Sequence, residues 1–205
     1  MEIIRVTAGV YGVNCYIVYD NTKEGIVVDP GGDADEILEI IKEKEINIKY
    51  IVLTHGHGDH IGGLVELKNT LKVPIMIHGE DRTMLADGSK NLSPTMAMGR
   101  VEVEPDILLK DGDIIKMGNQ EILVIHTPGH TKGGIALKVQ DNIITGDTLF
   151  TGSIGRTDLL GGDYSQLIES IKEKLFIYPD ETKVYPGHGP SSTIGREKVA
   201  NPFLK

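Results

Sequence analysis

The stretch THGHGDHIGG, residues 54–63, places three of the chain's seven histidines and one aspartate within six consecutive positions, 55 to 60. It follows a short apolar segment, KYIVLT at 49–54, which is typical of a buried strand. It precedes IGGLVELKNTL at 61–71, whose apolar residues recur at helical spacing. A strand, a polar run and a helix in this order predict one unit of an α/β arrangement, with the polar run where the strand ends and the helix starts.

The residue types in this run favour a metal site over a polar turn. Imidazole nitrogen and carboxylate oxygen are the ligands that a divalent metal of intermediate softness prefers. His55 and His57 are two apart, which places both rings on the same side of an extended segment. Asp59 and His60 can face the other side of a shared cavity, which leaves room for a second metal position. The alternative is a polar turn in which Asp59 caps the next helix and the histidines are solvated. This alternative does not explain why four ligand-type residues fall within six positions.

Three further ligand-type residues follow apolar segments later in the chain. His130 lies in HTPGHTKGG at 126–134, Asp147 in GDTLF and His188 in YPGHG. Each one alone is typical of a turn, because Gly-Asp and Gly-His-Gly commonly occur in turns. Together they repeat one arrangement, and strand ends that are far apart in sequence converge in space. The count therefore predicts a single site built from several loops.

The first third of the chain shows strand and helix patterns. Three β-branched segments predict an N-terminal meander, at 2–8, 14–20 and 24–29. The segment at 34–46 predicts a helix capped by Asp33. A further strand, predicted at 73–79, continues the β-α-β alternation.

The remainder of the chain alternates in the same way. The weak pattern at 81–104 predicts a short helix and a mobile loop. Helices are predicted at 164–176 and 194–200. The later strands are predicted at 113–118, 120–127, 134–140, 142–146 and 183–189. This order predicts one domain, residues 1–205, made of two stacked sheets with helices outside.

The composition restricts the classes of partner and compartment. The chain has 205 residues, 40% of them hydrophobic, which is enough for a substantial core. Its 21 basic and 30 acidic residues give a net charge of −9, which disfavours nucleic acid as a partner. A single cysteine, Cys15, and an N-terminus without the segments of a secretory signal indicate a cytoplasmic protein. No apolar run approaches the roughly 20 residues that cross a bilayer, so no membrane association is expected.

The runs THGHGDH, TPGHT, GDTLF and YPGHG, in this order, resemble the metallo-β-lactamase superfamily and, within it, the short glyoxalase II-like hydrolases. The resemblance extends over nearly the whole chain, from VNCYIV to NPFL. It implies an α/β (α+β) fold, a four-layer αββα sandwich, which agrees with the order of strands and helices above.

The resemblance also implies a ligand set for two divalent metal ions, with zinc expected and iron or manganese as alternatives. The seven protein ligands would be His55, His57 and His130 for one ion, Asp59, His60 and His188 for the other, and Asp147 between them. Asp29, in VVDPGG, matches a family aspartate that supports the site from behind. An Asp-Pro turn after a strand explains Asp29 equally well on sequence alone.

The reaction implied is hydrolysis of a small-molecule thioester: an S-2-hydroxyacylglutathione such as S-lactoylglutathione, or a related thioester. By this resemblance, a metal-bridging hydroxide would attack the carbonyl, Asp59 would orient it or accept its proton, and the thiolate would leave without a dedicated acid. Arg156, nine residues beyond Asp147, matches a basic residue that contacts glutathione; the alternative is a pair with Asp158. Larger glyoxalase II enzymes carry a C-terminal helical extension and a tyrosine where this chain has Pro190, so another thioester is an open alternative.

Other enzymes of the same fold supply rival functions. A persulfide dioxygenase shares the GRTD segment at 155–158 and would use a single iron held by His55, His130 and Asp147. A β-lactamase is disfavoured because several place cysteine where this chain has Asp147. A nuclease is disfavoured by the net charge of −9. The sequence leaves open the metal, the physiological substrate and the oligomeric state.

Several conspicuous residues are assigned to packing rather than to the site. His78 and His126 are interpreted as structural histidines. Met84, Met96 and Met98 are assigned to loop packing, with the lining of a substrate mouth as the alternative.

Overall fold

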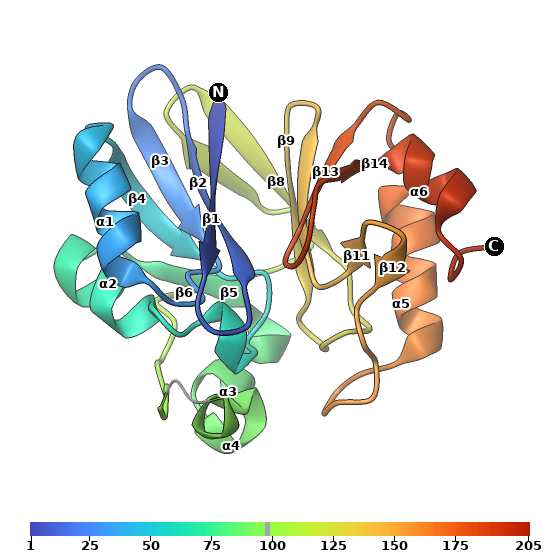
Figure 1. Cartoon of the computed structure of the whole chain (residues 1–205), viewed down its shortest axis with the longest axis horizontal. Coiled ribbons are helices and arrows are strands. Elements are labelled where there is room, and N and C mark those ends of the chain that lie inside the picture. Colours follow the sequence, from blue (N-terminus) through green and yellow to red (C-terminus); the bar gives the residue numbers. More distant parts are fainter. Residues whose placement is uncertain (97–98) are drawn as a thin grey trace.

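Two six-stranded sheets lie face to face in the computed structural model, which describes residues 1–96 and 99–205 (Figure 1). The first sheet takes its strands in chain order: β1 (Glu2–Ala8), β2 (Val13–Tyr19), β3 (Glu24–Val28), β4 (Asn47–Val52), β5 (Ile75–His78) and β6 (Ile107–Leu109). Strands β1 to β3 pair antiparallel, which confirms the meander, and β3 to β6 pair parallel. Helices α1 (Ala34–Glu43) and α2 (Leu64–Leu71) pack on its outer face.

The second sheet has the order β14-β13-β10-β9-β8-β7. Its strands are β7 (Ile114–Met117), β8 (Gln120–His126), β9 (Ile135–Val139), β10 (Asn142–Gly146), β13 (Lys183–Pro186) and β14 (Ser192–Thr193). A separate hairpin pairs β11 (Leu149–Phe150) with β12 (Ser153–Ile154). Helices α5 (Tyr164–Ser170) and α6 (Ile194–Ala200) cover the outer face of the second sheet.

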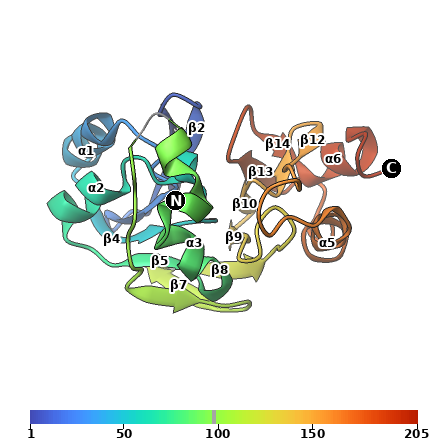
Figure 2. The ribbon, with the colours of Figure 1, turned by 90° about the horizontal axis from the view of Figure 1, so that it is seen from below.

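Alternate residues of each strand face different layers, as a strand of period two requires. Along β2, Cys15 and Ile17 pack in the apolar core shared with α1 and α2, while Tyr16 and Val18 pack in the core between the sheets. A third core joins the second sheet to α5 and α6. Figure 2 shows α1 and α2 on one outer side of the molecule and α5 and α6 on the other. The predicted α/β (α+β) class and αββα sandwich are therefore confirmed.

The predicted cap of α1 is wrong. Asp33 has φ 46° and ψ 45°, a left-handed conformation, and its side chain makes no hydrogen bond to the helix. Its Oδ2 instead accepts a hydrogen bond of 2.7 Å from the backbone N–H of Gly9, in the loop between β1 and β2. The helix predicted at 34–46 also ends earlier, at Glu43.

Two other predicted helices change character along their length. The helix predicted at 61–71 begins at Leu64, because the residues before it include the 3-10 turn Gly58–His60. The helix predicted at 164–176 is α-helical to Ser170 and continues as a π-helical segment, Ile171–Leu175.

The weakly patterned segment at 81–104 contains two short helices where one was predicted. These are α3 (Arg82–Leu85) and α4 (Gly88–Asn91). Ala97 and Met98 lie outside the described residues, and the mobility of the loop stays a prediction. None of the described helices is long and apolar enough to span a membrane.

Candidate metal centre

The seven predicted ligands meet at one edge of the two sheets. They follow the carboxyl ends of four strands: His55, His57, Asp59 and His60 come after β4, His130 after β8, Asp147 after β10 and His188 after β13. Strand β4 belongs to the first sheet and the other three to the second, so the site lies where the sheets meet. The structure thus brings all seven together, and their assignment as ligands stays a prediction.

Two glycines allow the ligand loops to approach one another. A Cβ atom on Gly58 would lie 2.7 Å from the Cα of Ser93, so the turn between His57 and Asp59 has no room for a side chain. A Cβ atom on Gly187 would collide with the carboxylate of Asp147. Glycine is therefore required at both positions by close packing around the ligands.

His55, His57 and His130 form a group that we call the buried cluster. Their exposed fractions are 1%, 3% and 4%. The Nε2 atom of His130 lies 3.0 Å from His57 Nδ1 and 3.3 Å from His55 Nε2. One ligand nitrogen from each ring lies within 4.8 Å of the others, which is a spacing that one ion can bridge.

Hydrogen bonds behind the buried cluster fix which ring nitrogen faces inward. His130 Nδ1 donates to the backbone carbonyl of Arg156 at 2.7 Å. His55 Nδ1 lies 3.1 Å from Thr54 Oγ1, which itself donates to Asp29 Oδ2 at 2.5 Å. Both rings therefore carry the proton on Nδ1 and turn an Nε2 lone pair into the site. His57 is reversed, with Nδ1 facing the other two rings.

Asp59, His60 and His188 form a second group, which we call the open cluster. His188 Nε2 lies 3.3 Å and His60 Nε2 3.9 Å from Asp59 Oδ2. The side chain of His188 is 31% exposed and that of Asp59 14%, whereas that of His60 is fully buried. His60 Nδ1 donates to Asp29 Oδ2 at 3.0 Å, so its Nε2 also faces inward. Asp29 thus lies behind the site, where the resemblance predicts it.

Asp147 lies between the two clusters. Its Oδ1 is 3.3 Å from His60 Nε2, and its Oδ2 is 3.7 Å from the Nε2 atoms of both His130 and His188. Three buried side-chain atoms have no hydrogen-bond partner among the described residues: His57 Nε2, His60 Nε2 and Asp147 Oδ1. Buried polar atoms are rarely left without a partner, and His60 Nε2 and Asp147 Oδ1 face one another, so this part of the site suits a cation.

The protonation states of His55, His57 and Asp147 fit the same interpretation. Burial holds the pKa of His55 well below its usual value and lowers that of His57 to about 3, so both rings are neutral. Burial alone would raise the pKa of Asp147, but His60 and the neighbouring histidines lower it overall, so the carboxylate is ionised. Neutral imidazole and ionised carboxylate are the forms that bind metal. For His60, burial lowers the pKa, but the carboxylates of Asp147, Asp29 and Asp59 raise it overall, well above its usual value. The donor set fits divalent metal ions, and nitrogen and oxygen ligands suit zinc, iron and manganese.

Asp81 is a buried residue of the site that the sequence analysis did not identify. It is 1% exposed and lies at the end of the 3-10 turn after β5. Its Oδ2 accepts from Gly56 N at 3.2 Å and from Thr131 Oγ1 at 2.7 Å, and its Oδ1 accepts from Gly133 N at 2.7 Å. One carboxylate thus ties the loop of His55 and His57 to the loop of His130.

Asn14 plays the corresponding part for the loop that carries His188. Its buried side-chain amide donates to the carbonyl oxygens of Pro186 at 2.9 Å and Gly189 at 2.8 Å. The hydroxyl of Tyr16 also donates to Pro186 O, at 2.7 Å. Strand β2 of the first sheet therefore holds a ligand loop of the second.

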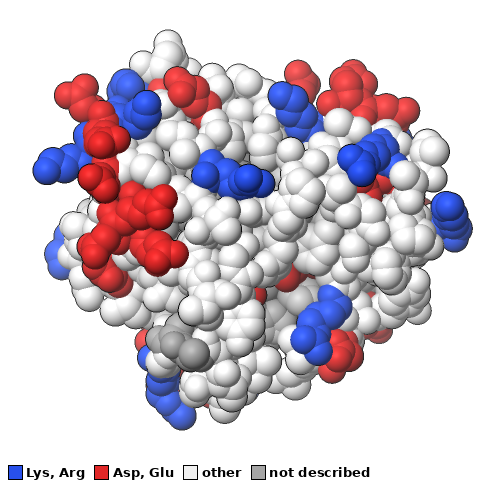
Figure 3. Space-filling model, viewed as in Figure 1, with Lys and Arg blue, Asp and Glu red and all other residues white. Residues whose placement is uncertain are grey.

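A cavity of about 370 Å³ opens above the clusters. Five ligands reach it: His57, Asp59, His130, Asp147 and His188. Its walls are mainly apolar, formed by Tyr11, Met96, Phe150, Ile154 and Leu159, with Arg156 as the one cation among them. Figure 3 shows a hollow at the lower centre of the molecule with acidic atoms inside it. Met96 therefore lines the mouth, which was the alternative assignment, whereas Met84 is buried and Met98 lies outside the described residues.

Arg156 makes the ion pair with Asp158 that the sequence offered as the alternative, and it also lies at the cavity. The pair has two contacts of 2.8 Å, Nε to Oδ1 and Nη2 to Oδ2. Its backbone carbonyl orients His130, which the sequence analysis did not anticipate. Whether it binds substrate stays a prediction.

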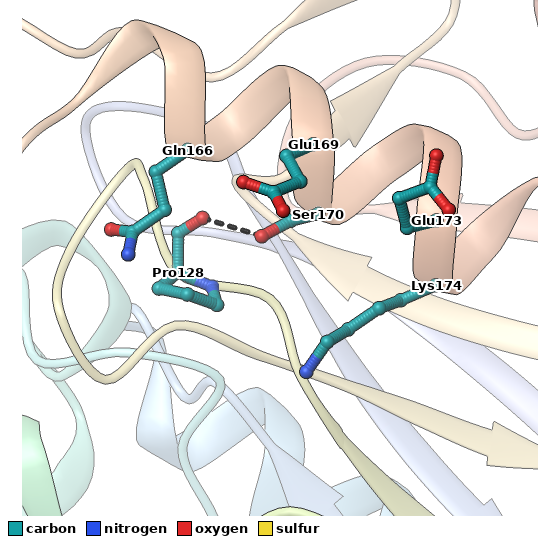
Figure 4. A pocket seen from close by; sticks show the side chains of 6 residues that line it. All are labelled: Pro128, Gln166, Glu169, Ser170, Glu173 and Lys174. Carbon is teal, nitrogen blue, oxygen red and sulfur yellow. Dashed lines mark hydrogen bonds between the residues drawn. The ribbon is translucent and has the colours of Figure 1, made fainter.

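Among the described residues, the metal-ligand groups of three or more side chains all lie at the site above. The hollow drawn in Figure 4 lies against α5, and its most prominent internal contact is a hydrogen bond of 2.7 Å from Ser170 Oγ to Pro128 O. His78 and His126 stack with ring centroids 4.0 Å apart, away from both clusters, and His126 Nε2 donates to Lys132 O. This agrees with their assignment as structural histidines.

Comparisons with known proteins agree with this geometry. A family model described as the metallo-beta-lactamase superfamily matches residues 8–188. The hydroxyacylglutathione hydrolase GloC of Haemophilus influenzae is 38% identical over 208 residues, which cover 100% of this chain and 97% of that protein.

Two solved structures have the same fold over the full length. The crystal structure of the BLEG-1 B3 metallo-beta-lactamase is 36% identical, covers 100% of both chains and gives a TM-score of 0.95. That of TTHA1623 in a di-iron-bound form is 34% identical, covers 98% of this chain and 100% of the other, and gives a TM-score of 0.86. The His and Asp clusters and the di-iron neighbour together support divalent metal binding. These relatives carry different functional names, so similarity alone does not select a substrate.

Proposed function

Because this chain belongs to the metallo-β-lactamase superfamily of metal-dependent hydrolases, we propose that its substrate is a small-molecule thioester. The thioester is an S-2-hydroxyacylglutathione such as S-lactoylglutathione, or a related compound. The name of the Haemophilus influenzae relative, a hydroxyacylglutathione hydrolase, supports this choice.

The two clusters supply the places for two ions. His55, His57 and His130 would hold one ion through inward-facing nitrogens, Asp59, His60 and His188 the other, and Asp147 would contact both. When bound, divalent ions supply a nucleophile from water at neutral pH and a Lewis acid for the carbonyl oxygen.

Asp59 is the side chain that handles the proton of the attacking water. It lines the cavity, and its Oδ2 lies 3.3 Å from His188 Nε2. Burial raises the pKa of Asp59, but His60 and His188 lower it overall, so the carboxylate is ionised at neutral pH. It can therefore accept a hydrogen bond from water and hold the proton during attack.

The observation that carries the proposal is the scarcity of proton-donating side chains among the described residues that line the cavity. Apart from the candidate ligands, Tyr11 and Arg156 are the lining residues that bear a transferable proton, and both are half exposed or more. An amine or alkoxide leaving group would need a positioned acid. A thiolate needs none, because free thiols have a pKa of about 8.5. The cavity therefore suits a thioester better than an amide.

Two rival reactions share parts of this site. A persulfide dioxygenase would use one iron on His55, His130 and Asp147, but His57 Nδ1 lies closer to His130 Nε2 than Asp147 does, at 3.0 Å against 3.7 Å. The similarity to a B3 metallo-beta-lactamase makes β-lactam hydrolysis the second rival. The presence of a complete open cluster favours hydrolysis over the dioxygenase.

The test uses protein purified without added metal, followed by metal analysis and three assays. We expect thiol release from S-lactoylglutathione or from a neutral S-lactoyl thioester, its loss on chelation, and its return on adding zinc, iron or manganese. Oxygen uptake with glutathione persulfide, or turnover of a β-lactam in the absence of thiol release, would replace this proposal by the corresponding rival.

A further inference from the structure

The hairpin of β11 and β12 lies against candidate ligands of both clusters. It begins two residues after Asp147, and two residues after it comes Arg156, whose backbone carbonyl accepts the hydrogen bond of His130. Within it, the ring of Phe150 meets the ring of His188 edge to face, with centroids 6.1 Å apart. One short segment is thus joined to three of the seven candidate ligands.

The hairpin also forms part of the cavity wall and steadies the loop of His188. Phe150 and Ile154 line the cavity. The hydroxyl of Thr151, in the turn of the hairpin, donates to the backbone carbonyl of Pro190 at 2.7 Å, two residues beyond His188. A shift of the hairpin would therefore move a wall of the cavity together with the loop of a partly exposed ligand.

A buried carboxylate on α6 holds this hairpin in place. Glu197 is 0% exposed and is not among the residues that line the cavity. Its Oε2 accepts from the backbone N–H of Gly152, in the hairpin turn, at 2.8 Å and from Asn201 Nδ2 at 2.9 Å. The amide of Asn201 also donates to the backbone carbonyl of Ser153 at 2.9 Å. Figures 1 and 2 show β12 next to α6, as these bonds require.

The other oxygen of Glu197 serves a different neighbour. Its Oε1 accepts from the hydroxyl of Ser192, which belongs to β14 of the second sheet. Burying a carboxylate is costly unless hydrogen bonds compensate it, and here they come from the hairpin, the sheet and α6 itself. The contact with the hairpin can therefore be disturbed separately from the contact with the sheet.

We propose that Glu197 is a positioning residue of the metal centre, which fixes the β11-β12 hairpin through Gly152. The fixed hairpin supports His188 through Phe150 and keeps the cavity wall in place. Glu197 acts only through the hairpin and touches neither metal nor substrate. Loss of a residue that bonds a metal ligand directly typically costs tenfold to a hundredfold in affinity, so loss of this more distant one should cost the open cluster about threefold to tenfold.

The experiment compares Glu197→Ala with Glu197→Gln by cobalt titration and by hydrogen exchange of the hairpin peptide in the metal-free protein. Glu197→Ala leaves the N–H of Gly152 without its acceptor, so the hairpin amides should exchange faster. The second cobalt ion should bind about threefold to tenfold more weakly. A glutamine keeps an oxygen for Gly152, and its amide can donate to the hydroxyl oxygen of Ser192, so Glu197→Gln should restore both properties.

Ser192→Ala is the matched control. It removes a hydrogen bond to the same carboxylate but leaves the bond to Gly152 in place. Both Ser192→Ala and Glu197→Ala should unfold at a lower temperature, whereas hairpin exchange and cobalt affinity should change only in Glu197→Ala. Equal changes in the two variants would mean that the carboxylate contributes to stability alone, and would overturn the proposal.

Asn201→Ala keeps the inference testable if Glu197→Ala does not fold. It removes the bond from α6 to the carbonyl of Ser153 and retains the carboxylate. Hairpin exchange should again become faster and cobalt binding weaker, by less than in Glu197→Ala. Unchanged exchange and affinity in Asn201→Ala would then reject the role of this anchor.

Thioester kinetics supply a readout that a general loss of stability would not move. Because Phe150 and Ile154 belong to the cavity wall, Glu197→Ala at saturating metal should raise KM more than it lowers kcat. The cobalt and exchange measurements need no substrate, so they still decide the role of Glu197 if no thioester is hydrolysed. Unchanged hairpin exchange and cobalt affinity in a folded Glu197→Ala reject the inference, whereas absence of thioester turnover in the wild type rejects only the proposed function.

Discussion

The buried cluster and the open cluster use the same kinds of donor in different surroundings. In the buried cluster all three histidines are at most 4% exposed, and Asp81, in the 3-10 turn after β5, ties their two loops together. In the open cluster the side chain of His188 is 31% exposed, and its loop is held from β2 by Asn14. Both clusters reach the cavity, but the buried one is the more enclosed, so we expect it to hold an ion more firmly than the open one.

Asp147 should matter to both clusters at once, because its two oxygens lie near ligands of both. Its replacement should therefore have the largest effect. Asp147→Ala should remove metal from both and lower thioester turnover on the order of a thousandfold or more. Metal analysis after dialysis, with steady-state kinetics, measures both effects. Asp35→Ala, at an exposed position of α1, is the control. Retention of full metal content with normal turnover would show that Asp147 does not join the clusters.

Removing one ligand from each cluster should separate their properties. His57→Ala removes a ligand and leaves a cavity in the buried cluster. This cluster should therefore lose its ion, and the protein should also unfold at a lower temperature. His188→Ala should loosen the open cluster alone, since water can reach the vacated position at a partly exposed side chain. Cobalt titration followed by absorbance, together with thermal unfolding, distinguishes the two. Identical metal loss in both variants would mean that the two clusters bind as one unit.

Asp81 offers a way to disturb the buried cluster without touching a ligand. Asp81→Asn keeps the shape but cannot accept all three hydrogen bonds, so metal affinity there should fall about tenfold to a hundredfold and stability by about 1–3 kcal/mol. Competition with a chelator measures the affinity and denaturant unfolding the stability. Thr131→Val, which removes one of the three donors, should give a smaller loss in the same direction. If the variant instead weakened the open cluster by as much, Asp81 would not be specific to the buried one.

The contrast between ligands and the residues that hold them also explains what the sequence could predict. His55 to His60 form a local pattern, and His130, Asp147 and His188 each follow a recognisable strand, so their convergence was predictable. Asp81 and Asn14 act through contacts to residues 50 and 172 positions away, and nothing in their own neighbourhoods marks them. Residues that position others are defined by the fold, which a single sequence does not display.

The fold shows the same division between local and distant causes. The strand β2 and the helix α1 have local patterns of residue type, and both elements were predicted. The cap predicted at Asp33 was wrong, because its carboxylate accepts a hydrogen bond from Gly9 in the turn between β1 and β2. Arg156 combines the two cases, since its charge was noticed from the sequence, whereas its backbone bond to His130 could be found only in the structure.

The smallest expected effect concerns how firmly β2 holds the loop of His188. Asn14→Ala leaves the carbonyls of Pro186 and Gly189 short of a donor, so it should cost about 1–2 kcal/mol and weaken metal binding at the open cluster alone. Tyr16→Phe is the matched control: Pro186 O keeps its bond from Asn14, so the cost should stay near 0.5–1 kcal/mol, with unchanged metal affinity. Denaturant unfolding and cobalt titration of both variants measure the difference. If Tyr16→Phe weakened the open cluster as much as Asn14→Ala, the loop would depend on packing along β2 as a whole and not on the amide of Asn14.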